Sequence, residues 1–223
     1  MKIPALTIAI AENIPLLITL QQHLHHQEPS LMPTWIYLSE STVIPPMMPD
    51  TVDILNPIGS YGQFITNLLA HVTTDYLLWI DTGWSFMPIE TSFCSASLSV
   101  LSTYSQVSQV KLDSEDYQRF DDRSQFSQPP IILGDGTQFY ILSPRKILGG
   151  LTLKPAITRV ADLRSCDPLR HDHTSDRETV TAALSIRSAQ SERYLSMRSP
   201  TFTPFIPKDQ QTYRPIPLHV DSP

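Results

Sequence analysis

The stretch Tyr76-Leu77-Leu78-Trp79-Ile80-Asp81-Thr82-Gly83-Trp84 decides the fold class of this chain. Its first five residues are all apolar, which is typical of a central strand that is covered on both faces. Asp81 then ends the apolar run with a carboxylate, which either serves a ligand or caps a turn at the strand end. Ligands of open parallel sheets bind at the carboxyl ends of the strands. The stretch therefore predicts a buried strand with a functional carboxylate at its end.

Strands and helices alternate around this stretch. Apolar runs predict strands, and leucines or other apolar residues at helical spacing predict helices. The predicted strands are Ala5–Ala11, Trp35–Leu38, Val52–Leu55, Tyr76–Ile80, Val107–Leu112 and Phe139–Leu142, and the predicted helices are Ile14–Gln27, Tyr61–Val72, Ile89–Tyr104 and Asp176–Arg187. This alternation favours an α/β fold of Rossmann-like type, with a mostly parallel central sheet flanked by helices.

The length and the proline distribution predict one domain with a tail. A chain of 223 residues with 41% hydrophobic content is long enough for one good core. Twenty prolines stand against seven glycines, and they cluster at 45–57, 129–155 and 200–223. Because proline interrupts regular structure, we expect a single domain over residues 1–198 and a Pro-rich extended C-terminal tail over 199–223.

Charge and cysteine content disfavour several classes of protein. The net charge is −6 and the basic residues form no run, so a nucleic-acid partner is not expected. The two cysteines, Cys94 and Cys166, lack the spacing of a zinc site or a disulfide framework. The apolar stretch Ile3–Ala11 is too short for a transmembrane segment and lacks the flanks of a signal peptide. These features predict a cytoplasmic protein.

Three segments, in this order, resemble the GT-A fold glycosyltransferases (family-2-like), which transfer a sugar from a nucleotide-sugar donor. Thr7–Asn13 is similar to the family's opening strand and its polar turn. Asn56–Trp84 resembles the family's next helix, with Asn67, and its strand ending in an acidic metal motif. Leu151–Arg159 resembles a stretch that follows the acceptor region, and Pro217–Val220 resembles the family's closing segment.

This resemblance implies a donor site at the strand ends. The implied donor-binding residues are Glu12, Asn13, Glu40, Asn67, Asp81, Thr82 and Trp84. Glu40 stands where the family places an acid that reads the uracil or ribose of the donor. For Trp84 two interpretations stay open, because an aromatic ring after the strand either stacks on a sugar or closes the core.

The resemblance also implies a divalent cation, Mn2+ or Mg2+, at Asp81. A leaving nucleoside diphosphate carries negative charge that the site must neutralise. The family motif has two acids within three residues, but here Gly83 stands in place of the second. Asp81, His219 and the donor phosphates are the implied ligands, and the missing acid leaves the metal dependence open.

The candidates for a general base are Asp176 and Glu178, at the start of the last predicted helix. Acids in a first helical turn are also favoured by the helix dipole alone, so a structural role is the alternative for each. Arg145, Lys146 and Lys154 are candidates for contact with phosphate or with the acceptor, or else solubilising charges.

The function expected from these features is transfer of a sugar from a nucleotide-diphosphate sugar to a glycan or other hydroxyl acceptor. The alternative is an inactive glycosyltransferase-like protein that binds a nucleotide or glycan or acts as a scaffold, which the missing acid at Gly83 permits. Another nucleotide-binding enzyme class is disfavoured, because the chain has neither a GxGxxG turn nor a GxxxxGK[ST] loop. The sequence leaves open the sugar, the nucleotide, the acceptor, the stereochemistry and the oligomeric state.

Overall fold

The structure is a computed structural model that describes residues 4–39, 52–56, 61–87, 92–112, 130–141, 154–165, 194–197 and 202–204. The helices are α1 (Ile14–Gln27), α2 (Tyr61–His71), α3 (Phe93–Thr103) and α5 (Val160–Arg164). The strands are β1 (Leu6–Ala11), β2 (Thr34–Leu38), β3 (Val52–Leu55), β4 (Tyr76–Ile80), β5 (Trp84–Phe86), β6 (Gln109–Lys111), β7 (Ile131–Ile132), β8 (Gln138–Ile141), β9 (Ala156–Arg159), β10 (Tyr194–Met197) and β11 (Phe202–Pro204).

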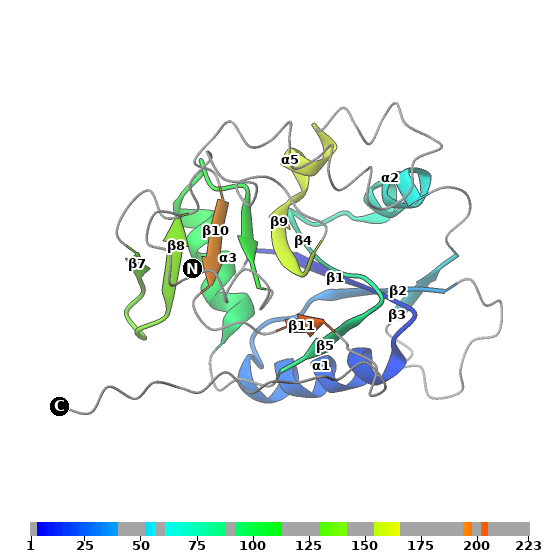
Figure 1. Ribbon diagram of the computed structural model, residues 1–223, viewed down its shortest axis with the longest axis horizontal. Coiled ribbons are helices and arrows are strands. Elements are labelled where there is room, and N and C mark those ends of the chain that lie inside the picture. The colour runs from blue at the N-terminus through cyan, green and yellow to red at the C-terminus, as the bar shows by residue number, and fades with distance from the viewer. Residues whose placement is uncertain are drawn as a thin grey trace, which may run out of the picture.

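One mixed, mostly parallel sheet forms the centre of the molecule (Figure 1). Its strand order is β3-β2-β1-β4-β9-β6-β10-β8-β7. The pairings β3-β2, β2-β1, β1-β4 and β6-β10 are parallel, whereas β9 and β8 run opposite to both of their neighbours. A separate pair, β11 with β5, lies beside this sheet. The predicted α/β fold with a mostly parallel sheet flanked by helices is therefore confirmed.

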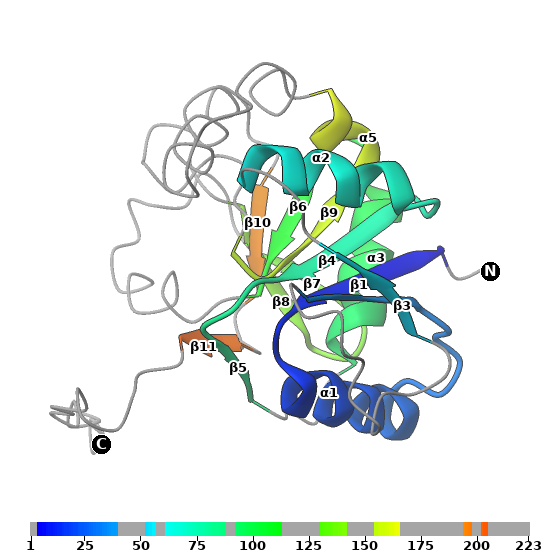
Figure 2. The ribbon, with the colours of Figure 1, turned by 90° about the vertical axis from the view of Figure 1, so that its right-hand side faces the viewer.

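The sheet is covered on both faces (Figure 2). Alternate residues of β1, β2 and β4 point to opposite sides. Ile8, Trp35 and Leu78 belong to the cluster that includes the buried residues of α1 and α3. Ala9, Ile36 and Trp79 belong to the cluster that includes α2 and α5. Continuous apolar strands are required because each face of the sheet is buried, which explains why β4 has no polar residue.

Charged side chains bind the ends of α3. The carboxylate of Glu28 is buried and accepts the backbone N–H groups of Cys94 and Ser95 at 3.0 and 2.6 Å. It also accepts the hydroxyl of Ser95 at 2.5 Å. These N–H groups have no partner inside the helix, and the helix N-terminus favours a negative charge. Glu28 therefore fixes the start of α3 against the end of α1.

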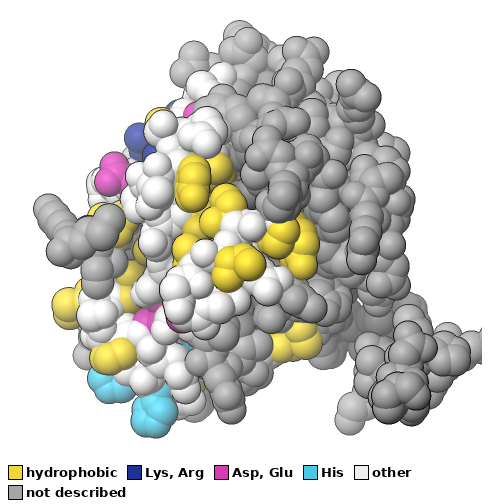
Figure 3. Space-filling model, turned by 90° about the vertical axis from the view of Figure 1, so that its left-hand side faces the viewer, with side chains coloured by type: hydrophobic (Ala, Val, Ile, Leu, Met, Phe, Trp, Pro, Cys, Tyr) yellow, Lys and Arg dark blue, Asp and Glu magenta, His cyan; other side chains and the backbone are white. Residues whose placement is uncertain are grey.

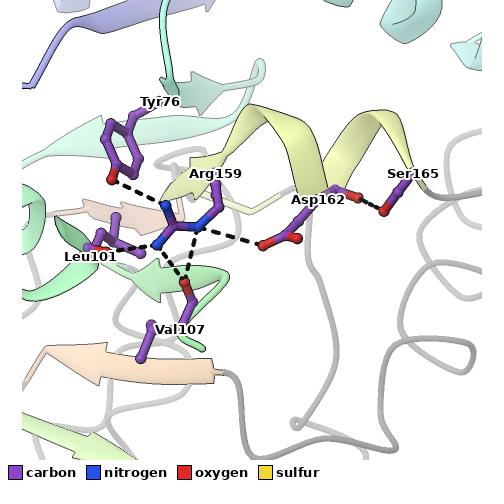
Figure 4. Close-up of polar contacts among 6 residues, drawn as sticks. All are labelled: Tyr76, Leu101, Val107, Arg159, Asp162 and Ser165. Carbon is purple, nitrogen blue, oxygen red and sulfur yellow. Dashed lines mark hydrogen bonds and ion pairs between the residues drawn. The ribbon is translucent and has the colours of Figure 1, made fainter. Parts of the chain in front are cut away.

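Arg159 binds the other end of α3 (Figure 4). Its guanidinium donates to the carbonyl of Leu101 at 2.6 Å and to that of Val107 at 3.2 Å. It also donates to the hydroxyl of Tyr76 at 3.3 Å and lies 3.8 Å from Asp162. Arg164 plays the same part for α2, since it donates to the carbonyls of Leu69 and Val72. Cations at helix C-termini satisfy the last carbonyls and complement the dipole.

The structure adds elements that sequence patterns did not predict. Short strands β5, β7, β9, β10 and β11 and the helix α5 are among them. The chain segment expected to form an extended tail contains β11, which pairs antiparallel with β5. The helix predicted at Asp176–Arg187 lies outside the described residues. None of the helices that the structure describes is both long and apolar enough to cross a membrane.

Replacing Glu28 by Gln is expected to destabilise the fold by about 1–3 kcal/mol, because one of two oxygen acceptors for the α3 N–H groups is lost. Urea denaturation followed by circular dichroism measures this change. Glu12→Gln is the matched control, since Glu12 is exposed, and we expect it to stay within about 0.5 kcal/mol of the wild type. Equal unfolding midpoints for the two variants would contradict the capping role.

Candidate active site at the strand ends

The carboxyl ends of β1, β2 and β3 meet at one edge of the sheet. The N–H of Glu12 donates to the carbonyl of Leu38 at 2.9 Å, and the N–H of Ser39 donates to that of Leu55 at 3.2 Å. Pairing thus continues past the last residue of each strand, which places Glu12 and Ser39 side by side. Burial raises the pKa of the nearby Tyr37, and the negative charge of Glu12 raises it further.

Glu12 has a left-handed backbone, with φ of 41°, which no other described non-glycine residue shares. This conformation is costly for a residue with a side chain. It turns the chain out of β1 and into α1 within two residues. Strained residues of this kind often occur at functional sites, and the exposed Glu12 side chain stands at the edge where the prediction places the donor.

Asn13 joins α1 to β5. Its side-chain oxygen accepts the N–H of Leu16 at 3.0 Å, as an N-cap residue does. Its side-chain amide donates to the carbonyl of Trp84 at 3.4 Å. These contacts give Asn13 a structural role beside the donor-binding role predicted for it.

Asp81 lies just past the end of β4 and is only 6% exposed. One carboxylate oxygen accepts the N–H of Thr82 at 2.7 Å, and the other accepts the hydroxyl of Tyr61 at 3.0 Å. Tyr61 is the first residue of α2. Its ring packs against Phe64, and Phe64 packs against Trp79 of β4. The carboxylate is therefore held in a fixed orientation on the α2 side of the sheet.

Gly83 occupies a turn that requires glycine. Its φ is 86°, in the left-handed region. A side chain at this position would meet no atom within 4 Å, so the constraint comes from the backbone rather than from space. The absence of an acid at Gly83 thus coincides with a turn that disfavours any side chain.

Trp84 is 5% exposed and belongs to the core cluster on the α1 and α3 side. This burial supports the interpretation in which its ring closes the core. A groove of about 440 Å³ runs between β5 and the first turns of α1, lined by Asn13, Pro15, Leu16, Thr19, Gly83, Trp84, Ser85 and Phe86. Gly83, two residues after Asp81 in the sequence, is one of the residues that line this groove.

The remaining predicted site residues are not all near Asp81. Asn67 is exposed on α2, six residues beyond Tyr61, which corresponds to about 9 Å along the helix axis. Glu40, Asp176, Glu178 and His219 lie outside the described residues. Tyr61 was missed by sequence analysis, because its partner lies 20 residues away and only the packing of α2 on β4 brings them together.

Histidines supply no evident metal site in the described segments. His25 and His26 are exposed in the last turn of α1, and histidine side chains are visible on the surface in Figure 3. His23 instead packs edge-on against Phe86 at 4.8 Å, and burial lowers its pKa. Within those segments, no three His, Cys, Asp or Glu side chains form a group suited to a metal ion.

The fold has counterparts among solved structures. A mannosyltransferase from Pyrobaculum calidifontis, in complex with GDP-Man and Mn2+, matches 94% of this chain with a TM-score of 0.55 and 10% identity. The chain has the GT-A glycosyltransferase fold. TarS of S. aureus (residues 1–349) matches 90% of the chain with a TM-score of 0.51 and 11% identity. GalNAc-T7 with UDP, GalNAc and Mn2+ matches 99% with a TM-score of 0.54 and 7% identity.

This GT-A-like chain covers 59%, 60% and 46% of the lengths of those three structures. No protein-family model and no curated protein sequence matches it. The likeness therefore rests on the arrangement of strands and helices. It places the edge with Asp81 in a fold whose neighbours include complexes with a nucleotide or nucleotide sugar and Mn2+.

The bond between Tyr61 and Asp81 is expected to couple the two residues by about 1–2 kcal/mol, because hydrogen bonds to charged groups are stronger than neutral ones. A double-mutant cycle of Tyr61→Phe and Asp81→Asn, followed by thermal unfolding, measures the coupling. Tyr104→Phe is the control, since the Tyr104 hydroxyl makes no hydrogen bond within the described part of the chain. If Tyr104→Phe couples to Asp81→Asn as strongly as Tyr61→Phe does, the hydrogen bond between Tyr61 and Asp81 is refuted.

Proposed function

We propose that this protein is a glycosyltransferase that transfers a sugar from a nucleotide-diphosphate sugar to a hydroxyl group of a glycan or another acceptor. The observation that carries the proposal is the fixed, buried carboxylate of Asp81 at the carboxyl end of β4. Its support is the GT-A fold around that carboxylate. Ligands of such sheets bind outside the carboxyl ends of the strands.

The proposed reaction is a displacement at the anomeric carbon of the donor sugar. A bond forms between the acceptor oxygen and that carbon, and the bond from the carbon to the diphosphate oxygen breaks. The bonding pair leaves with the nucleoside diphosphate, and the acceptor proton passes to a carboxylate base, for which Asp176 and Glu178 are the candidates. Glu12, Glu40, Asn13, Asn67, Thr82 and Trp84 stay proposed donor-binding residues.

The described residues do not by themselves fit a divalent cation. Asp81 is a single carboxylate, and both of its oxygens accept hydrogen bonds from the protein. Mg2+ prefers six oxygen ligands and commonly takes one or two carboxylates together with substrate phosphates. His219 remains a proposed ligand and lies outside the described residues.

A binding or scaffold protein that has lost turnover is the alternative. It is supported by the left-handed Gly83, which disfavours an acid at that position. Binding of a nucleotide sugar without transfer or hydrolysis would favour this alternative. Product formation with any acceptor would exclude it.

Isothermal titration calorimetry with a panel of UDP- and GDP-sugars is expected to detect binding of at least one donor. Asp81→Asn is expected to change the Kd or the transfer rate by at least about tenfold, which corresponds to roughly 1.4 kcal/mol. Asp135→Asn is the control, because within the described segments Asp135 accepts just a turn N–H from Thr137, at the β7–β8 end of the sheet. If no nucleotide sugar binds with or without Mn2+, the proposal is wrong.

A further inference from the structure

Lys111 is a buried charge close to the candidate site. It is the last residue of β6 and is 3% exposed. Its neighbour Val110 belongs to the core cluster on the α1 and α3 side, so Lys111 points to the opposite, α2 side. Gln109 points the same way as Lys111, and its amide donates to the hydroxyl of Thr158 on β9 at 2.7 Å.

The strand register brings Lys111 into line with β4. Ala156 of β9 pairs with Trp79 on one side and with Lys111 on the other. Trp79 belongs to the cluster on the α2 side, so Lys111 and Trp79 share a face. Asp81 follows Trp79 by two residues and contacts Tyr61 of α2, which places its carboxylate on that face as well. Two strand spacings, about 9–10 Å, separate β4 from β6.

A second lysine lies at the same edge. Lys154 precedes Ala156 by two residues and is half-buried. The N–H of Leu112 donates to the carbonyl of Pro155 at 2.9 Å, so β9 and β6 remain paired up to this point. β9 runs antiparallel to β4, so Lys154, just before β9 begins, lies at the end of the sheet where β4 ends. β9 lies between β4, which Asp81 follows, and β6, which ends with Lys111.

The charges at this edge suit a diphosphate. Burial of an ammonium group is costly unless anions lie near it. Both lysines make contacts within the chain. Their two ammonium groups come from the last residue of β6 and from the segment just before β9, and these are the two strands that follow β4 in the sheet order. Lysine binds phosphate as a point charge and needs no metal to do so.

We propose that Lys111 and Lys154 bind the diphosphate of the donor and neutralise the charge that develops on it as it leaves. This inference rests on the proposed function and specifies how its site works. It accounts for a donor site that has Gly83 instead of a second acid. The lysines take over the charge compensation that a cation held by two acids would give.

The test is calorimetric binding of UDP and GDP, in excess EDTA and separately in Mn2+, to the full chain. Lys111→Met and Lys154→Met remove the terminal ammonium group and keep a flexible apolar stem, and Lys154→Arg keeps the charge. We expect wild-type affinity in EDTA to stay within about threefold of that in Mn2+, and each Met variant to lose about tenfold. Lys154→Arg is expected to lose less than Lys154→Met.

Circular dichroism and thermal unfolding verify that each variant is folded. If Lys111→Met does not fold, the Lys154→Met variant decides the question. Lys154 is only half-buried, so its replacement disturbs the packing less. Binding that EDTA abolishes, or that both Met variants leave unchanged, would overturn the lysine inference while preserving the proposed function. Absence of binding in EDTA and in Mn2+ alike would overturn both.

Discussion

The hydrogen bonds donated by the guanidinium of Arg159 are the contacts that tie the most elements of the sheet and its helices together. Arg159 lies at the end of β9, the antiparallel strand inserted between β4 and β6. Its donors reach α3 through Leu101, the segment before β6 through Val107, and β4 through Tyr76. Only an arginine has enough donors in a fixed fork to serve three elements at once. The strand that Arg159 ends also aligns Trp79 with Lys111, so the residue lies on the same strand that brings the charged residues of the edge together.

The two faces of the sheet carry different parts of the core and of the candidate site. The α1 and α3 side holds the larger cluster, which includes Trp84. On this side the buried carboxylate of Glu28 accepts the N–H of Cys94 at the start of α3. The α2 side carries the first residue of α2, Asp81 and Lys111. A helix that begins at the strand ends, as α2 does, brings its first side chain to the carboxylate that ends the strand. Tyr61 is therefore placed by the same packing of Phe64 on Trp79 that stabilises α2.

Apolar periodicity was enough to predict the first half of the fold. Val52–Leu55 and Tyr76–Ile80 have the predicted bounds, and α1 does too, because each is a self-contained pattern with a clear turn beside it. β9 and β10 are only four residues long and owe their places to neighbours remote in sequence, so no local pattern indicates them. The same limit applies to the site. Asp81 follows from the end of an apolar run, whereas Tyr61 and Lys111 become recognisable only from the pairing of strands and the packing of a helix.

The position of β10 bears on how the chain is made. Among the strands that the structure describes, β10 alone joins the β7–β8 hairpin to the rest of the sheet, because it pairs with β6 on one side and β8 on the other. During translation β6 and β8 are synthesised before β10 (Tyr194–Met197), and more than fifty residues separate β8 from β10. Until β10 is made, the strand edges of β6 and β8 that pair with it lack this partner. Unpaired strand edges are templates for wrong pairing between nascent chains. Slow translation between β8 and β10 would thus lengthen the interval in which the edges of β6 and β8 are open to wrong pairing.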